Sequence, residues 1–279
     1  MSIYVIVIIK LNRIILRMLE FPNINPVAID LGVIQIRWYA ISYIAGILFS
    51  WGLILNIIKF KNLKIDNKVI SELISNSMIG IIIGGRLGYV IFYNPDYYLN
   101  NLLEIFKLWN GGMSFHGGFI GVVFAVIYSS KKSKTAILIL ADLIAIAAPI
   151  GIFFGRLANF INGELYGRIT NHSFGMIFPN AGNSPRHPSQ LYEAFFEGFL
   201  LFIIMLLFIK FTNILNKKGL ITALFLSCYG SFRFMIEFFR EPDANIGLLY
   251  FNFSMGQLLS LPMIIVGLYF IIFIARKKV

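Results

Sequence analysis

Charged residues are scarce in this chain of 279 residues, because only 13% of them are Asp, Glu, Lys or Arg. A soluble domain carries roughly 25% charged residues. Hydrophobic residues make up 58% of the sequence. The composition therefore excludes an ordinary soluble domain and predicts an integral membrane protein.

Cysteine and histidine are also scarce. The single cysteine, Cys228, excludes a disulfide within the chain and cannot build a cysteine-based metal site. It lies in an apolar run with no histidine near it in sequence, so we interpret it as a small buried hydrophobe in preference to a catalytic thiol. The three histidines, His116, His172 and His187, lack the spacing of zinc ligands. We therefore expect neither a metal nor a soluble cofactor.

Long apolar segments dominate what is present. Crossing ~30 Å of hydrocarbon takes about 20 apolar residues. We expect seven transmembrane helices, near residues 38–58, 71–93, 115–130, 136–158, 190–210, 219–238 and 256–275. The predicted fold class is an all-α integral membrane protein, with residues 1–279 forming a single polytopic membrane domain.

Clusters of basic residues predict the orientation of these helices. The clusters lie at 59–68, 131–134, 210–218 and 276–278. Cytoplasmic loops carry an excess of Lys and Arg, whereas residues 94–114, 159–189 and 239–255 contain few lysines. We expect the N-terminus outside and the C-terminus in the cytoplasm, with a periplasmic arm at 94–114 and a small irregular periplasmic cap at 159–189. The net charge of +11 is then a signal of topology, and nucleic acid is set aside as a partner.

The most informative polar segment, Gly155–Gly167, follows an apolar run. It contains Arg156, Asn159, Glu164 and Gly167 within thirteen positions. An arginine at the edge of the hydrocarbon layer is costly without a partner. Amides hydrogen-bond esters or phosphates, and glycines let the backbone approach a ligand closely. The alternative is an arginine that extends to water, which does not account for its polar neighbours.

A stripe of polar side chains is expected on the helix near 219–238. Tyr229, Arg233, Glu237 and Arg240 recur at intervals of four, four and three residues, so they share one helix face. An Arg233–Glu237 pair by itself would be consistent with a structural role. The full stripe is better explained as the wall of a polar cavity inside a helix bundle.

Three further polar residues lie in or near the apolar segments. His116 precedes two glycines at the start of the third segment, and is either a hydrogen-bonded structural histidine or a general base. Arg86 lies deep in the second segment and is expected to need an anionic partner, either a carboxylate or a lipid phosphate. Tyr39 follows Arg37 at the start of the first segment. Because guanidinium groups bind phosphate in a bidentate manner, we interpret the arginines as a phosphate-handling set.

Four motifs occur in a fixed order along the chain. They are His116-Gly-Gly-x-x-Gly, Gly155-Arg-x-x-Asn-Phe-x-Asn-x-Glu-x-x-Gly, Arg186-His-Pro-Ser-Gln-Leu-Tyr-Glu and Tyr229-Gly-x-x-Arg-Phe-x-x-Glu-Phe-x-Arg. Over about residues 26–275 the chain closely resembles bacterial prolipoprotein diacylglyceryl transferases. The resemblance implies a seven-span inner-membrane enzyme with its active site toward the outer half. Such an enzyme moves a diacylglyceryl group from phosphatidylglycerol to the lipobox cysteine of a secreted prolipoprotein, which is the first step of lipoprotein maturation. The thiol becomes a thioether and glycerol phosphate is released.

The resemblance also implies roles for individual residues. His116 and Arg233 match the catalytic pair of the family. The other matching positions, expected to bind substrate, are Arg156, Asn159, Glu164, Gly167, Tyr39, Tyr229 and Glu237. Arg86 and Arg240 join this set because of their charge and position. Glu164 is expected to orient Arg156 or to bind a glycerol hydroxyl.

Two other functions compete with the transferase. A transporter of lipids or phosphate compounds should contain internal repeats and helices broken near the midplane, but no repeat is evident. A membrane scaffold would not need arginines that face the bundle interior. Residues 1–17 have no counterpart in the family pattern, so we expect either a dispensable extension upstream of a start at Met18 or an anchor along the interface.

Overall fold

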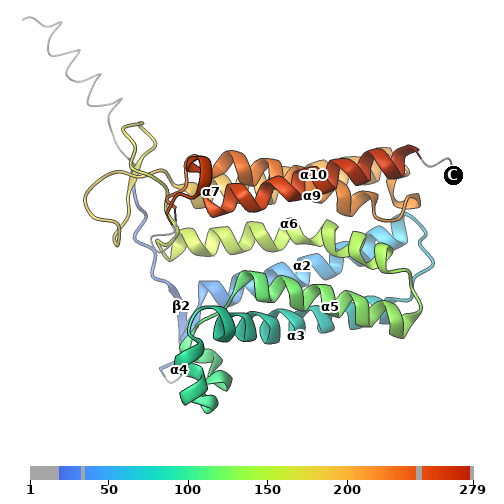
Figure 1. The fold of residues 1–279 in the computed structure, drawn as a ribbon, viewed down its shortest axis with the longest axis horizontal. Coiled ribbons are helices and arrows are strands. Elements are labelled where there is room, and N and C mark those ends of the chain that lie inside the picture. The colour runs from blue at the N-terminus through green and yellow to red at the C-terminus, as the bar shows by residue number, and fades with distance from the viewer. Residues whose placement is uncertain (1–18, 33–34, 243–246, 277–279) are drawn as a thin grey trace, which may run out of the picture. The chain divides into compact units, whose positions relative to one another are not determined.

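The computed structural model describes residues 19–32, 35–242 and 247–276, and this part of the chain is mostly helical (Figure 1). The expected extension at residues 1–17 lies outside the described residues. The chain divides into two compact units, one made of Met1–Leu48 with Ala148–Val279 and the other of Phe49–Ala147. The two boundaries fall within helices α2 (Trp38–Phe60) and α6 (Ile137–Ile161).

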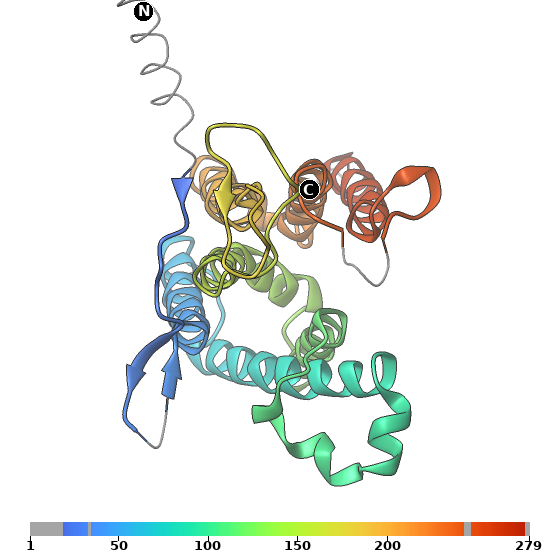
Figure 2. The ribbon, with the colours of Figure 1, turned by 90° about the vertical axis from the view of Figure 1, so that its left-hand side faces the viewer.

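In the unit Phe49–Ala147, helices α3 (Asn67–Phe92) and α5 (Phe115–Ser133) lie side by side (Figures 1 and 2). Gly84 of α3 and Gly117 of α5 face each other so closely that a Cβ on either would collide with the carbonyl of the other. Small residues at such positions let membrane helices approach. At the other end of the pair, Lys132 Nζ lies 3.0 Å from Glu72 Oε2.

The segment between α3 and α5 is the expected arm. It forms three short helical turns, α4 (Pro95–Asn100), η1 (Leu102–Phe106) and η2 (Leu108–Asn110). Exposed apolar side chains, including Leu103, Phe106 and Trp109, cover much of its surface. The segment is ordered by its contacts with α3, which are described below.

In the other unit, α9 (Leu220–Ile236) packs along α10 (Met255–Arg276), as Figures 1 and 2 show. The helix Ser189–Phe211 consists of α7 (Ser189–Glu193), a π-helical stretch η3 (Ala194–Leu200) and α8 (Leu201–Phe211). The short 3-10 turns η4 (Ile214–Asn216) and η5 (Tyr250–Asn252) precede α9 and α10.

Two small sheets add to the predicted all-α fold. Strand β1 (Leu19–Glu20) pairs in parallel with β4 (Met176–Ile177), and β2 (Val27–Asp30) pairs antiparallel with β3 (Gln35–Arg37) in the hairpin visible in Figure 2. Strands of two to four residues carry too little periodic pattern to be recognised in a sequence.

The expected cap at 159–189 is irregular. Helix α6 continues to Ile161. Between Ile161 and Ser189, all of which the structure describes, the regular element is the two-residue strand β4. Phe160, Met176 and Phe178 form its buried core, and Phe21 packs against them. The position of this cap on the periplasmic side stays a prediction.

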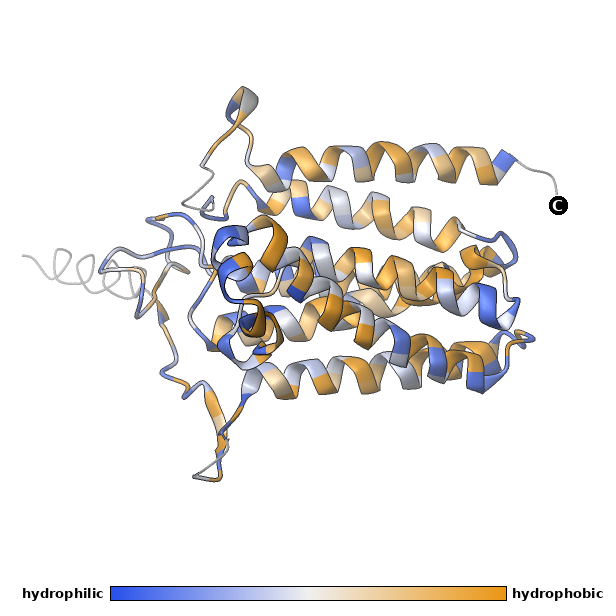
Figure 3. Ribbon diagram, turned by 60° about the horizontal axis from the view of Figure 1, so that its bottom comes forward, coloured by the Kyte–Doolittle hydropathy of each residue, from blue (hydrophilic) through white to orange (hydrophobic). Residues whose placement is uncertain are grey.

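Each of the seven expected transmembrane segments coincides with a helix. Within the described residues, five helices are long and apolar enough to cross a membrane, namely Trp38–Phe60, Asn67–Phe92, Ile137–Ile161, Ser189–Phe211 and Met255–Ile274. Figure 3 shows apolar residues along most of the C-terminal helix. These helices support a multi-pass membrane protein. The count of seven, the orientation and the single membrane domain stay predictions.

Candidate functional site

Two glutamates of the helix Ser189–Phe211 are completely buried. Glu193 ends α7 and Glu197 lies in the π-helical stretch, and both side chains are 0% exposed. Single-turn π segments are rare and frequently occur at functional sites. Burying an ionised carboxylate is costly unless cations or hydrogen-bond donors compensate it.

Two arginines from different helices supply that compensation. The Nε atom of Arg156, on α6, lies 2.8 Å from Glu193, and its Nη2 lies 3.6 Å from Glu197. The Nη1 atom of Arg233, on α9, lies 3.0 Å from Glu193 and 3.5 Å from Glu197. The two carboxylates therefore hold two like-charged guanidinium groups together.

A third ion-pair centre extends this cluster. Glu237, which caps the C-terminus of α9, pairs with Arg233 and lies 3.2 Å from Arg240 Nη1. Ser254 Oγ donates a hydrogen bond of 2.6 Å to the other oxygen of Glu237. Arg240 Nε also lies 3.6 Å from Glu193. We call the six residues Arg156, Glu193, Glu197, Arg233, Glu237 and Arg240 the arginine–glutamate network. Its three positive and three negative side chains balance.

Arg156 keeps a nitrogen outside these pairs. Its Nη1 has no carboxylate partner among the described residues, and 19% of its side chain is exposed. A balanced network with an available guanidinium donor is suited to accept one further anionic group.

Asn159 lies one helical turn beyond Arg156 and is buried. Its Nδ2 donates hydrogen bonds to Glu164 Oε1 at 2.8 Å and to the hydroxyl oxygen of Tyr39 at 3.3 Å. Of the two expected roles of Glu164, the contact with Arg156 is not formed among the described residues, and the contact with a glycerol hydroxyl stays a prediction. The contact with Arg156 is not formed because the chain turns after Ile161, which brings the exposed Glu164 back onto the asparagine side chains.

Gly167 lies where backbone segments meet beside Arg240. Its N–H donates to the carbonyl of His187 at 2.8 Å, and its carbonyl accepts from Arg186 at 3.1 Å. A Cβ at Gly167 would lie 2.5 Å from the carbonyl oxygen of Phe239. Because both backbone groups of Gly167 are used in the protein, close packing explains the glycine at this position, and its contact with substrate stays a prediction.

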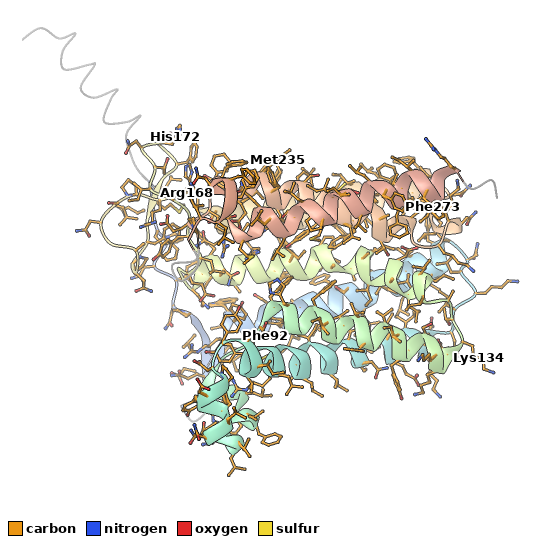
Figure 4. All side chains as sticks on the ribbon, viewed as in Figure 1. Phe92, Lys134, Arg168, His172, Met235 and Phe273 are labelled. Carbon is orange, nitrogen blue, oxygen red and sulfur yellow. The ribbon has the colours of Figure 1, made fainter. Side chains whose placement is uncertain are left out.

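His187 joins the cap to this packing. Its Nδ1 lies 3.2 Å from the Tyr192 hydroxyl, and its ring contacts Phe239 edge-on at a centroid distance of 5.3 Å. Burial, together with the charge of nearby His172, lowers the pKa of His187. Arg168 and His172, labelled in Figure 4, lie in the cap.

His116 and Arg86 lie in the unit Phe49–Ala147. His116 is exposed in the first turn of α5, whose N-cap, Ser114, accepts a hydrogen bond from Gly117 N–H. Arg86 is buried and binds backbone carbonyls of the arm. Within the described residues Arg86 has no carboxylate partner, because backbone carbonyls at the ends of the arm's helical turns accept from it instead. The lipid phosphate that was the other expected partner stays a prediction.

Among the described residues, no group of three or more His, Cys, Asp or Glu side chains is placed to hold a metal ion.

The chain is similar to known proteins over most of its length. The family model for prolipoprotein diacylglyceryl transferase matches residues 26–273. The chain is 50% identical over 254 residues to the phosphatidylglycerol–prolipoprotein diacylglyceryl transferase of Rickettsia bellii, covering 91% of this chain and 97% of that protein. The protein of the same name from Rickettsia akari is 53% identical over 254 residues, 91% of this chain and 98% of its own length. The chain belongs to the prolipoprotein diacylglyceryl transferase family.

In this member of the transferase family, one unit brings together most of the residues expected from the sequence. Arg156, Arg233, Glu237 and Arg240 meet in the arginine–glutamate network. Tyr229 lies one turn before Arg233 on α9 and stacks on Phe225, with ring centroids 5.5 Å apart. The substrate contacts and catalytic roles of all these residues stay predictions.

Sequence reasoning missed the two carboxylates at the centre of the network. Glu193 ends the Arg186–Glu193 motif, and Glu197 follows it by four residues inside an apolar run. An ionisable residue inside a membrane span indicates a functional site. That rule, applied to acidic as well as basic residues, would have found both.

Proposed function

We propose that this chain transfers the diacylglyceryl group of phosphatidylglycerol to the thiol of a lipobox cysteine in a secreted prolipoprotein. The observation that carries the proposal is the arginine–glutamate network, in a chain whose relatives are named for this reaction. Three arginine side chains that are 11–19% exposed surround buried glutamates in a site built from apolar helices. Electrostatic stabilisation of a developing charge is strong where water is excluded.

The reaction forms one bond and breaks another. The cysteine sulfur attacks the glyceryl carbon that carries the phosphate, so a C–S bond forms. The C–O bond to the phosphate breaks, and its electron pair leaves on the oxygen of glycerol phosphate. A neutral thiol is a weak nucleophile, so we assign removal of its proton to the imidazole of His116. This residue is exposed in the first turn of α5.

The arginines bind the phosphate in this proposal. Arg156 offers Nη1, which the network does not pair with a carboxylate in the described residues, and Arg233 stabilises the leaving oxygen. Tyr39, Asn159 and Glu164 form a connected polar set, in which Asn159 lies one helical turn beyond Arg156. We assign this set to the glycerol headgroup, whose hydroxyls both donate and accept hydrogen bonds.

The proposal includes a position in the cell. Seven helices cross the bacterial inner membrane, the lysine-rich turns face the cytoplasm, and the site opens toward the outer half of the bilayer. Membrane lipids surround the helices and supply phosphatidylglycerol. The lipobox region of the precursor reaches the site from the same bilayer.

The test combines purified protein, phosphatidylglycerol and a lipobox peptide, and measures the mass of the peptide. Wild-type protein should add one diacylglyceryl group to the cysteine. His116→Ala should abolish the transfer because no base remains for the thiol proton. Arg233→Lys should also fail, because a point charge cannot replace the planar guanidinium between two glutamates.

Glu72→Gln is the matched control, because it alters an ion pair that is partly exposed at the other end of α3 and α5. It should retain normal transfer. Arg156→Ala should weaken phosphatidylglycerol binding by a few kcal/mol, the usual worth of a desolvated charge-assisted contact. Normal peptide lipidation by His116→Ala and Arg233→Lys together would refute the assigned chemistry, and unchanged lipid affinity of Arg156→Ala would refute the phosphate site.

A further inference from the structure

The guanidinium of Arg86 is enclosed by the arm that joins α3 to α5. Arg86 is 3% exposed, and its Nε donates to the carbonyl of Ile105 at 2.8 Å. An arginine has five N–H donors, one on Nε and two on each Nη. In Arg86, Nε donates to one carbonyl and each Nη to two, so all five N–H groups are used. The five acceptors are the backbone oxygens of Glu104, Ile105, Lys107, Gly111 and Gly112.

These carbonyls lie at or just beyond the ends of very short helical turns, and those of Glu104 and Lys107 also accept from the N–H groups of Lys107 and Asn110. The last carbonyls of a helix have no partner within it, and they carry the negative end of the helix dipole. Nη2 of Arg86 lies 2.6 Å from the carbonyl of Glu104 and 3.2 Å from that of Lys107, at the end of η1. The buried guanidinium of Arg86 thus donates hydrogen bonds to carbonyls at the ends of both η1 and η2, and none of its N–H groups remains for a lipid phosphate.

The same stretch of α3 also holds the chain that leads to His116. Nη1 of Arg86 binds the carbonyls of Gly111 and Gly112. Two residues further on, Ser114 N–H donates to the carbonyl of Gly85 at 2.8 Å. The Ser114 hydroxyl then caps α5, and the tight contact of Gly117 with α3 sets the position of the helix start. His116 lies between these two attachments.

We propose that Arg86 is a positioning residue for the reaction: it fixes the arm and the start of α5, and thereby places the imidazole of His116. The inference rests on the proposed function, since His116 is the base assigned there. It replaces the expectation that Arg86 binds substrate. A displacement of about 1 Å in a reacting group costs up to roughly 100-fold in rate, so a small shift of this segment is sufficient to impair the reaction.

Two variants test the inference. Arg86→Lys keeps the buried charge but has three donors in place of five. Gly112→Ala keeps Arg86 intact, but its Cβ would lie 2.6 Å from the ring of Tyr89 and 3.0 Å from Nη1 of Arg86, so the arm must move. Glu72→Gln again serves as the control, because it alters the same helix pair without touching the arm.

Two readouts are measured on each full-length protein in lipid. The first is transfer kinetics with phosphatidylglycerol vesicles and a lipobox peptide. Both variants should lower kcat by roughly 100-fold, with KM for phosphatidylglycerol changed by less than about twofold. The second is trypsin cleavage after Lys107, whose carbonyl Arg86 holds. Cleavage should become faster in both variants and stay slow in Glu72→Gln.

Each other result has a definite meaning. A raised KM with normal kcat in Arg86→Lys would show that Arg86 contacts the lipid, and would overturn the inference. Faster cleavage at Lys107 with unchanged kcat would separate the arm from His116, and would also overturn it while leaving the proposed function intact. Activity in His116→Ala would instead overturn the proposed base, whatever the arm does. Gly112→Ala covers the case in which Arg86→Lys fails to fold.

Discussion

Glu193 connects three arginines through two oxygens that are fully buried. Oε2 pairs with Arg156, and Oε1 faces Arg233 and Arg240. Removing such a carboxylate leaves three arginines to share the two remaining glutamates, and breaking a buried ion pair from one side is more harmful than removing the whole pair. Glu193 is thus the carboxylate that connects all three arginines, as Arg233 is the arginine that connects all three carboxylates.

Glu193→Gln should lower the stability of the folded protein by about 3–5 kcal/mol, the usual cost of breaking a buried ion pair from one side. The amide keeps the size of the side chain and removes its charge. Thermal unfolding in lipid nanodiscs measures the change. Glu72→Gln should cost less than about 1 kcal/mol, because its pair with Lys132 is partly exposed. Equal effects of the two substitutions would contradict the central position of Glu193.

Gly167→Ala should reduce both stability and transfer. The new Cβ would lie 2.5 Å from the Phe239 carbonyl and 2.7 Å from His187 Cβ, so the backbone bridge between Gly167 and Arg240 must open. Overpacking of this kind costs roughly 1–3 kcal/mol. Unfolding temperature and peptide lipidation are measured together. Gly52→Ala is the control, since nothing lies within 4 Å of its added Cβ, and a neutral Gly167→Ala would contradict the close packing.

At the scale of elements, the stability of the cap depends on the protonation state of His187. Burial is the main cause that lowers the pKa of His187, and the charge of His172 adds to it. A histidine in an unfolded chain has a pKa of about 6.5. Between that value and the lowered pKa, the unfolded cap binds a proton that the folded cap does not. Stability therefore falls as the pH decreases through this window.

Thermal unfolding between about pH 8 and pH 5 measures this dependence. The wild-type protein should lose stability below about pH 6.5, and His187→Gln should show a weaker loss. His172→Gln should also reduce the loss, because it removes the charge that acts on His187. A pH profile of His187→Gln identical to that of the wild type would contradict the assignment.

The arm and the cap differ in what orders them. The arm turns around one buried cation and keeps its apolar side chains outside. The cap has a small aromatic core of its own, formed by Phe160, Met176 and Phe178. Loss of Arg86 should therefore affect the arm more than the cap, which is why the trypsin test is aimed at Lys107.

At the scale of the whole molecule, the orientation rests on the basic residues beside the helices. The prediction is tested in a Cys228→Ser background, which removes the natural cysteine. Asn183→Cys, in the cap, should react with a membrane-impermeant thiol reagent applied from outside the inner membrane. Lys134→Cys, in the turn after α5 (Figure 4), should react only after the membrane is opened. The reverse pattern would invert the orientation.

Much of the helical framework was predictable, because long apolar segments and their flanking charges need no tertiary information. Each expected segment coincides with a helix. The stripe from Tyr229 to Arg240 was also predictable in part, since residues three and four apart share a helix face. The Arg233–Glu237 pair confirms the spacing.

The partners of the polar residues were less predictable. Glu164 contacts Asn159 rather than Arg156, because a turn after α6 reverses the chain. Glu197 lies in a π-helical stretch that no motif marked. The short strand pairing between β1 and β4 joins segments far apart in sequence, and nothing in either segment specifies the other.

The sequence by itself determined the membrane class, the positions of the apolar helices and the family, because these depend on composition, local periodicity and motif order. Only the tertiary structure decided how each buried charge is compensated. Arg86 binds five carbonyl groups of the arm, whereas Arg156 and Arg233 share two buried glutamates. A buried arginine requires hydrogen-bond acceptors, and both backbone carbonyls and carboxylates can accept its hydrogen bonds. The sequence does not show which of these acceptors will lie near the arginine, because that depends on how the chain folds.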